Sequence, residues 1–222
     1  MNKFFIKRFL LIFTILILGA EFSFAEKISF NADKMSGTAG NKNNTTVLKG
    51  NAKVITETME IFADYIELSG KDFRFIKASG NVNGVNKESQ ISFKAENLSY
   101  DRQTKIAVLE NKVELTDTEN DVHAKAEVIE YNQELETAVM QIEIELKQKD
   151  NVCSCAYAVY YKKEQRLTMN GNPQIIQNTD TFKAQSITLD MDTQEITLSG
   201  RVKGSVTTEK KETDNERPDE HN

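Results

Sequence analysis

The sequence predicts an all-β protein: a twisted open β-jelly roll, or rolled repeat sheet, built from about six units of roughly 30 residues. Three observations predict it. A short motif recurs at nearly constant intervals, apolar and polar side chains alternate with a period of two, and the chain has only 2 prolines. One such unit cannot bury its apolar face alone, whereas stacked units share one continuous core.

The first element is an expected secretory signal peptide. Basic residues at positions 3, 7 and 8 precede an apolar stretch at 9–18, and Ser23 and Ala25 supply small residues for cleavage. The apolar stretch is shorter than the roughly 20 helical residues that span a bilayer. We therefore assign residues 1–25 to a signal peptide, and we expect a secreted, soluble mature chain beginning at Glu26.

The repeat itself is the pattern Ala-x-x-apolar-x-(apolar or aromatic). Its copies begin at Ala63, Ala95, Ala126, Ala156 and Ala184, with a partial copy at Ala32, at intervals of 31, 32, 31, 30 and 28 residues. In the fourth unit the pattern consists of Ala156, Val159 and Tyr161. This regularity indicates one structural unit used repeatedly.

A second marker, centred on Gly-Asn, runs in phase with the first. Measured at Gly50, Gly80, Glu110, Gly171 and Gly200, its intervals are 30, 30, 61 and 29 residues. The double interval contains residues 140–146, which have lost the glycine but occupy its place.

Alternation of apolar and charged residues around both markers predicts strands with one buried face. The step of three from each repeated Ala to the next apolar residue reverses this alternation, so we expect a bulge there. Polar segments at 101–104, 132–134 and 190–193 predict turns, and 38–46 predicts a loop. The jelly-roll domain should therefore span residues 26–206, followed by a disordered acidic tail at 207–222.

The net charge and the motifs that the sequence lacks argue against two classes of function, nucleic-acid binding and enzymatic catalysis. The full chain has a formal net charge of −6, and removal of residues 1–25 leaves about −8 because three basic groups and Glu21 are lost. An acidic chain is a poor partner for nucleic acid, whose phosphates require a basic face. The sequence contains no nucleophile elbow, metalloprotease motif, phosphate-binding glycine loop or Cys/His pair, so we expect no enzymatic activity.

The chain has two cysteines, Cys153 and Cys155. In an extended segment they share a face near the upper limit of disulfide reach, so a bridge between them would be strained. A redox or metal role is conceivable, but two thiolates alone do not make a zinc site. A structural or incidental pair is the preferred interpretation.

The phased motifs resemble the LptA/OstA family of periplasmic lipopolysaccharide-transport proteins, in which Ala-Asp and Gly-Asn-(Ala/Val) elements alternate. The resemblance covers roughly residues 28–206. The matching residues are Ala32-Asp33, Leu48 to Val54, Ala63-Asp64, Gly80-Asn81-Val82, Ala95-Glu96 and Gly200-Arg201-Val202.

This resemblance implies an interior groove that holds acyl chains, with no cofactor or metal. It also implies LptC-like and LptD-like partners joined by edge-strand pairing, and a possible head-to-tail homo-oligomer. The chain departs from the family in its acidic tail and at Ser154, which the motif alignment places where other units have Ile61, Phe93 or Phe182.

The predicted function is transport of lipopolysaccharide, or a related glycolipid, from the inner to the outer membrane through the groove. The alternatives are a structural or adhesive β-solenoid that binds protein or glycan on its outer face, and an LptC-like sibling. A dry core and a lipid groove use the same residue types, and we take the inward row as the candidate lipid-binding site. That row consists of Val54, Ile61, Ala63, Val82, Ile91, Phe93, Ala95, Val113, Val122, Ala124, Ala126, Phe182 and Ala184.

Overall fold

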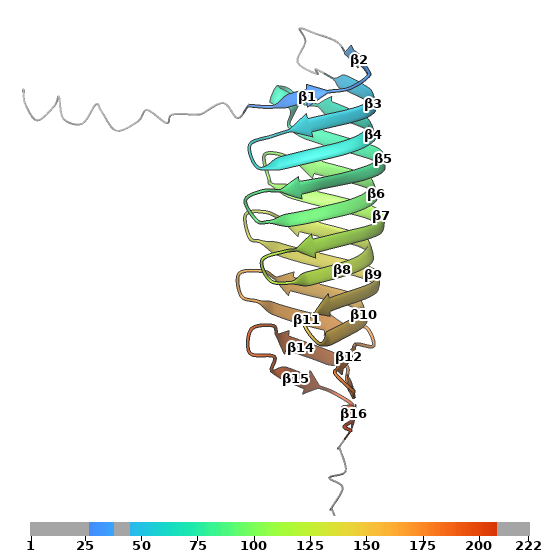
Figure 1. The fold of residues 1–222 in the computed structure, drawn as a ribbon, viewed down its shortest axis with the longest axis vertical. Coiled ribbons are helices and arrows are strands. Elements are labelled where there is room, and N and C mark those ends of the chain that lie inside the picture. Colours follow the sequence, from blue (N-terminus) through green and yellow to red (C-terminus); the bar gives the residue numbers. More distant parts are fainter. Residues whose placement is uncertain (1–26, 38–44, 208–222) are drawn as a thin grey trace, which may run out of the picture.

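The computed structural model describes residues 27–37 and 45–207, which form one 16-stranded antiparallel sheet. Neighbours in the sheet are mostly neighbours in sequence, and Figure 1 shows them stacked as rungs along the long axis. The strands are β1 (Ser29–Asn31), β2 (Lys34–Gly37), β3 (Thr46–Ile55), β4 (Met59–Ser69), β5 (Phe75–Asn86), β6 (Ile91–Asp101), β7 (Ile106–Asp117), β8 (Val122–Asn132), β9 (Thr137–Gln148), β10 (Asn151–Tyr161), β11 (Arg166–Asn170), β12 (Gln174–Gln177), β13 (Asp180–Lys183), β14 (Ser186–Asp190), β15 (Ile196–Ser199) and β16 (Lys203–Ser205). One short 3₁₀ helix, η1 (Lys71–Phe73), lies between β4 and β5.

Each long strand changes register near its middle, and these irregularities line up into one crease along the sheet. The crease folds the sheet into two facing walls, visible as a front and a fainter back layer in Figure 1. The first wall contains residues 52–63, 82–95, 113–126, 144–155, 174–183 and 203–205. The second wall contains residues 46–49, 65–79, 97–110, 128–141, 157–170 and 186–199. A change of register is confirmed at Ala63, Ala95 and Ala126, where a bulge was predicted, whereas in the fourth unit it lies between Cys155 and Tyr157.

The Gly-Asn marker makes the crease because two consecutive residues there have positive φ. In β5 these are Gly80 (φ 76°) and Asn81 (φ 49°), a conformation that glycine and asparagine tolerate best. The corresponding pairs in the other units are Gly50-Asn51, Asn111-Lys112, Ile142-Glu143, Gly171-Asn172 and Gly200-Arg201. The equivalent of the glycine in the third copy is therefore Asn111, not Glu110, and residues 140–146 do contain the missing copy.

The Ala-Asp motif lies beside this corner on the neighbouring strand. The Asn81 amide donates to Asp64 (2.8 Å), as the Asn51 amide does to Asp33 (2.9 Å). The next unit replaces this pair with an ion pair between Lys112 and Glu96 at 2.6 Å. The two motifs recur in phase because they meet across each rung of the crease.

Turns at the ends of the strands follow the prediction. The Asp101 carboxylate accepts hydrogen bonds from the backbone N–H of Gln103 (2.9 Å) and of Thr104 (3.4 Å). Asn132 and Asp190 accept equivalent bonds in their own turns. These side chains satisfy backbone donors that the strands leave unpaired.

The predicted alignment of the fourth unit is wrong by one residue. The inward row of β10 consists of Cys153, Cys155, Ala158 and Tyr160, because Ile144 pairs with Cys155 and Met140 with Ala158. The equivalents of the repeated Ala therefore lie at intervals of 31, 32, 31, 29 and 29 residues. Ser154 is exposed, and Cys153 occupies the position of Ile61 and Phe93. The motif selected Ala156 instead of Cys155 because Cys155 replaces the repeated Ala in this unit and an alanine directly follows it.

Strands after β10 are interrupted at the crease. Residues 171–173 separate β11 from β12, residues 184–185 separate β13 from β14, and residues 200–202 separate β15 from β16. The predicted signal peptide, most of the loop at 38–46 and all but Thr207 of the predicted tail lie outside the described residues.

Candidate functional site

Twelve of the thirteen residues of the predicted inward row lie in the first wall, and Ala184 lies in the interruption between β13 and β14. Eleven of the thirteen are buried, with exposures between 0% (Val54, Ile61 and Val122) and 8% (Ala95). The remaining two, Phe182 and Ala184, are only partly buried and pack against the core from the interrupted end of the sheet. The predicted row has no member on β9, β10 or β12, where the buried residues Ile144, Leu146, Cys153 and Ile175 continue it.

The second wall supplies an opposite apolar row that the site prediction missed. Half of it was detectable from the motif, in which Ile66, Leu68, Leu98, Tyr100, Ile129, Tyr131, Ile187 and Leu189 are the apolar residues that follow a repeated Ala. Its buried residues include Leu48, Ile66, Leu68, Ile76, Leu98, Tyr100, Leu109, Ile129, Tyr131, Met140, Ala158, Tyr160, Leu167, Met169, Ile187 and Leu189.

Side chains of the two rows fill the space between the walls. Phe93 and Leu115 from the first wall and Leu109 and Tyr131 from the second wall enclose a cavity of only about 10 Å³, which is the scale of a single water. The repeated Ala lies at the crease, where the backbones of the two walls converge. Ala63, for example, pairs there with Ala52.

The walls end in turns on the side opposite the crease, which we call the mouth. One polar cluster crosses the mouth between β7 and β10. The Tyr160 hydroxyl donates to Asp117 (2.8 Å), and the Lys162 ammonium lies 3.1 Å from both Asp117 carboxylate oxygens and 2.6 Å from Glu119. Asn120 donates to both Asp117 and Tyr160, at 3.0 Å each.

Asp117 and Lys162 are charged groups in an otherwise apolar interior, with side-chain exposures of 0% and 3%. Burial alone would raise the pKa of the Asp117 carboxyl, but the bonds from Tyr160, Lys162 and Asn120 outweigh it and lower that pKa. Burial alone would lower the pKa of Lys162, but the two carboxylates raise it. Both groups are therefore charged at neutral pH.

At the next level, hydrogen bonds rather than an ion pair cross the mouth. The Gln148 amide (3.2 Å) and the Lys149 ammonium (3.3 Å) donate to the backbone carbonyl of Met191, and the Asn151 amide donates to Gln194 (2.6 Å). Each of these bonds across the mouth joins residues at least 40 positions apart, from one wall to the other. Side chains and turns hold the mouth shut, whereas backbone ladders run along each wall.

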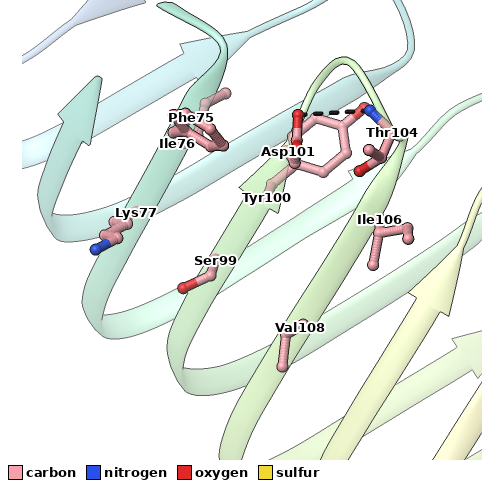
Figure 2. Close-up of a pocket in the computed structure, with 9 residues that line it drawn as sticks. All are labelled: Phe75, Ile76, Lys77, Ser99, Tyr100, Asp101, Thr104, Ile106 and Val108. Atoms are coloured by element: carbon pink, nitrogen blue, oxygen red, sulfur yellow. Dashed lines mark hydrogen bonds between the residues drawn. The ribbon is translucent and has the colours of Figure 1, made fainter. Parts of the chain in front are cut away.

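The outer face of the second wall carries a shallow hollow of about 230 Å³ between β5, β6 and β7 (Figure 2). Phe75, Ile106 and Val108 line it with apolar surface, and Asp101 lies at its rim, bonded to the Thr104 backbone. Arg74 pairs with Asp101 at 2.6 Å and stacks on the Phe75 ring. Arg74 and Asp101 are therefore paired with each other, and Lys77 also lines the hollow.

Cys153 and Cys155 are both free thiols, one buried and one partly buried. Burial raises the pKa of Cys153 to about 12 and that of Cys155 to about 11, so little thiolate forms at neutral pH. Within 27–37 and 45–207, no group of three His, Cys, Asp or Glu side chains could hold a metal ion. Within the same ranges, no helix is long and apolar enough to cross a bilayer.

The two ends of the sheet present strand edges. At the first end β1 and β2 pair only with β3, and at the other end β15 pairs only with β14 and β16 only with β13. Large apolar side chains are exposed beside both edges. They are Phe30 and Met35 at the first end, and Val202 and Val206 at the other.

A folded open sheet with an apolar interior and a strand edge at each end defines a class of elongated β-proteins. Residues 30–137, just under half of the chain, match the family described as "LptA/(LptD N-terminal domain) LPS transport protein". This part of the chain is therefore LptA/OstA-like, as its motifs predicted. No curated protein matches it.

A crystal structure described as that of LptH is also similar to this chain. Its description calls LptH "the LptA homologous periplasmic component of the conserved lipopolysaccharide transport device from Pseudomonas aeruginosa". The two chains share 12% identity with a TM-score of 0.25, over 82% of this chain and 96% of the other.

Proposed function

We propose that this chain is a periplasmic lipopolysaccharide-transport protein that holds the acyl chains of the lipid between its two walls. The observation that carries the proposal is the unbroken apolar interior, which runs from Leu48 in β3 to Leu189 in β14. Apolar area removed from water contributes roughly 25 cal/mol per Å², so such an interior binds acyl chains without charged contacts.

The free edges support a bridging role for the same protein. Unpaired backbone groups on β1, β2, β15 and β16 are able to pair with strands of a neighbour. The partners would be LptC-like and LptD-like proteins or further copies arranged head to tail. The lipid would then pass from one apolar interior to the next, without a cofactor.

The filled interior favours a second candidate, a structural or adhesive β-solenoid that binds protein or glycan on its outer face. A cavity of about 10 Å³ admits no acyl chain. Transport therefore requires the walls to separate at the mouth, where side chains rather than strand ladders join them. The solenoid candidate requires no such separation.

Photo-crosslinking distinguishes the two candidates. A photoreactive amino acid replaces Phe93, which is 6% exposed and faces the opposite wall, and a matched variant carries it at Lys94. Lys94 is the next residue on the same strand but points outward, with a side-chain exposure of 72%. Irradiation in the native cell is followed by mass spectrometry of covalent lipid adducts.

Transport predicts lipid adducts at Phe93 and none at Lys94. Variants at Ile61 and Phe182 repeat the measurement at other levels of the interior. Folded variants that yield no lipid adduct at Phe93, Ile61 or Phe182 would exclude lipid transport and favour the solenoid.

A further inference from the structure

The polar cluster between β7 and β10 contains charged side chains that the two neighbouring levels of the mouth do not pair in this way. Asp117 and Lys162 face each other across the mouth at 3.1 Å, whereas Asn86 and Gln133 occupy one adjacent level and Gln148 and Met191 the other. Only this one of the three levels carries a buried ion pair. The difference requires a physical reason.

Stability alone is a poor reason. A buried ion pair loses the hydration of both charges, and apolar residues of similar volume often hold a protein together at least as well. The neighbouring level shows that hydrogen bonds to amides and to a backbone carbonyl can close the same mouth without an ion pair. The charged cluster must therefore offer something other than closure.

Reversibility is the property that an ion pair offers here. An apolar contact loses its hydrophobic stabilisation when it opens, because its surface returns to water. Asp117 and Lys162 instead regain their hydration when they separate. Glu119, with a side-chain exposure of 57%, already reaches water and holds Lys162 from the outer side. The Asp117–Lys162 ion pair itself can therefore separate without uncovering a large apolar side chain.

We propose that Asp117, Glu119, Tyr160 and Lys162 form a latch, which holds the walls together at mid-length and separates to admit an acyl chain. The inference rests on the proposed transport function for its ligand, a lipid with apolar chains. The wall motion itself does not depend on that function. The latch sets where along the mouth the interior opens.

A native thiol reports the opening of the walls. Cys153 is 1% exposed and lies on the inward row of β10, the strand that carries Tyr160. Replacing Cys155 with Ala, the residue at that position in most other units, leaves Cys153 as the single thiol. The measurement is the alkylation rate of Cys153 by N-ethylmaleimide in the mature chain under native conditions at constant pH.

Two variants weaken the latch. Asp117→Asn/Lys162→Gln replaces the ion pair with neutral groups of similar size, and we expect alkylation at least about tenfold faster, as for any local opening made more frequent. Tyr160→Phe keeps the ring in the core but removes its bond to Asp117, and a rise of about threefold is expected. If the double variant does not fold, Tyr160→Phe decides the test alone.

Two controls separate the latch from other effects. Glu164→Gln/Arg166→Gln removes an exposed ion pair in the same turn as Lys162, and should leave the rate unchanged. Ile129→Val weakens the packing of the second wall away from the mouth, and reports what general loss of stability does to the rate. At equal stability, Cys153 should be alkylated faster in the latch variants than in Ile129→Val.

The outcomes keep the latch and the transport function apart. Alkylation rates in folded latch variants that equal those of the controls would overturn the latch, even if lipid adducts form at Phe93. Faster alkylation in the latch variants, with no lipid adduct at Phe93 in any variant, would support the latch and exclude the transport function.

Discussion

The section from β3 to β10 and the section from β11 to β16 build the same crease in two ways. Strands of 10 to 12 residues run through the crease in the first section, which we call the continuous section. In the second, the interrupted section, strands of three to five residues stop on either side of it. Pro173, which lacks a backbone donor, lies in the first of these interruptions.

The comparison shows that the crease does not depend on an unbroken strand. Gly171 and Gly200 have the same positive φ as Gly80, at 74° and 72° against 76°. What the interrupted section loses is burial, since Phe182, Ala184, Ile196 and Leu198 are only partly buried. The interrupted section should therefore contribute less to stability than the continuous one.

The largest expected difference between the sections is the cost of removing a core phenylalanine. Phe93→Ala in the continuous section should destabilise the protein by about 3–5 kcal/mol, as for other buried phenylalanines. Phe182→Ala, at the equivalent position of the interrupted section, should cost about 1–2 kcal/mol because the ring is already partly in water. Urea denaturation of both variants measures the difference, and equal losses would contradict the comparison.

A smaller effect tests the corner itself within the continuous section. Gly80→Ala should destabilise by about 1–2 kcal/mol, because φ is positive and a Cβ atom would lie 2.7 Å from an Asp64 oxygen. Ile142 is a β-branched residue at φ 66° and is 54% exposed. Ile142→Asn should therefore stabilise by about 1 kcal/mol. Thermal unfolding gives both signs, and a loss of stability in Ile142→Asn would show that the isoleucine makes a favourable contact there.

The smallest expected effect is electrostatic and belongs to the second wall of the continuous section. The Arg74 guanidinium lowers the pKa of Asp101 to about 2, helped by backbone donors in the turn. Because that pKa is below its ordinary value of 3.8, the ion pair stabilises the fold above pH 3.8 and loses this effect as the pH falls towards 2.

Asp101→Asn should keep the turn, as Asn132 does in the next unit. It should cost less than about 1 kcal/mol at neutral pH, as exposed ion pairs do. Its stability should fall less than that of the wild type between pH 4 and pH 2. Unfolding curves across this range measure the effect, and parallel pH profiles would show that the ion pair does not contribute.

The sequence predicted most of the fold because its two motifs meet at the crease in every unit. Positive φ at the corner favours Gly-Asn, and the close approach of the walls there favours Ala. Because the corner recurs in every strand, the spacing of both motifs is set by the strand length. Prediction failed where these constraints relax. In the fourth unit the position of the repeated Ala is occupied by Cys155, and the alanine of the motif, Ala156, is the next residue. In the third unit Asn111 replaces glycine and keeps the positive φ.

The candidate site was only half predicted for the same reason. The row from Val54 to Ala126 was recovered in the first wall, but the opposite row and the latch were not. Asp117 continues the inward alternation of Val113 and Leu115, which was a usable signal. Lys162 continues that of Ala158 and Tyr160, but the one-residue misalignment of the fourth unit placed it outside. The alternation of apolar and polar residues shows which face of each strand is buried. It does not show how the sheet folds, so it could not predict that the two walls pack against each other.

From β3 to β10 each strand is hydrogen-bonded to the strands directly before and after it in the chain. Each rung can therefore form as soon as the next hairpin of chain exists, without waiting for a distant segment. A polypeptide delivered across a membrane from its amino terminus could assemble rung by rung as it emerges. The strand order of this sheet thus allows folding to proceed from the amino terminus while the rest of the chain is still being delivered.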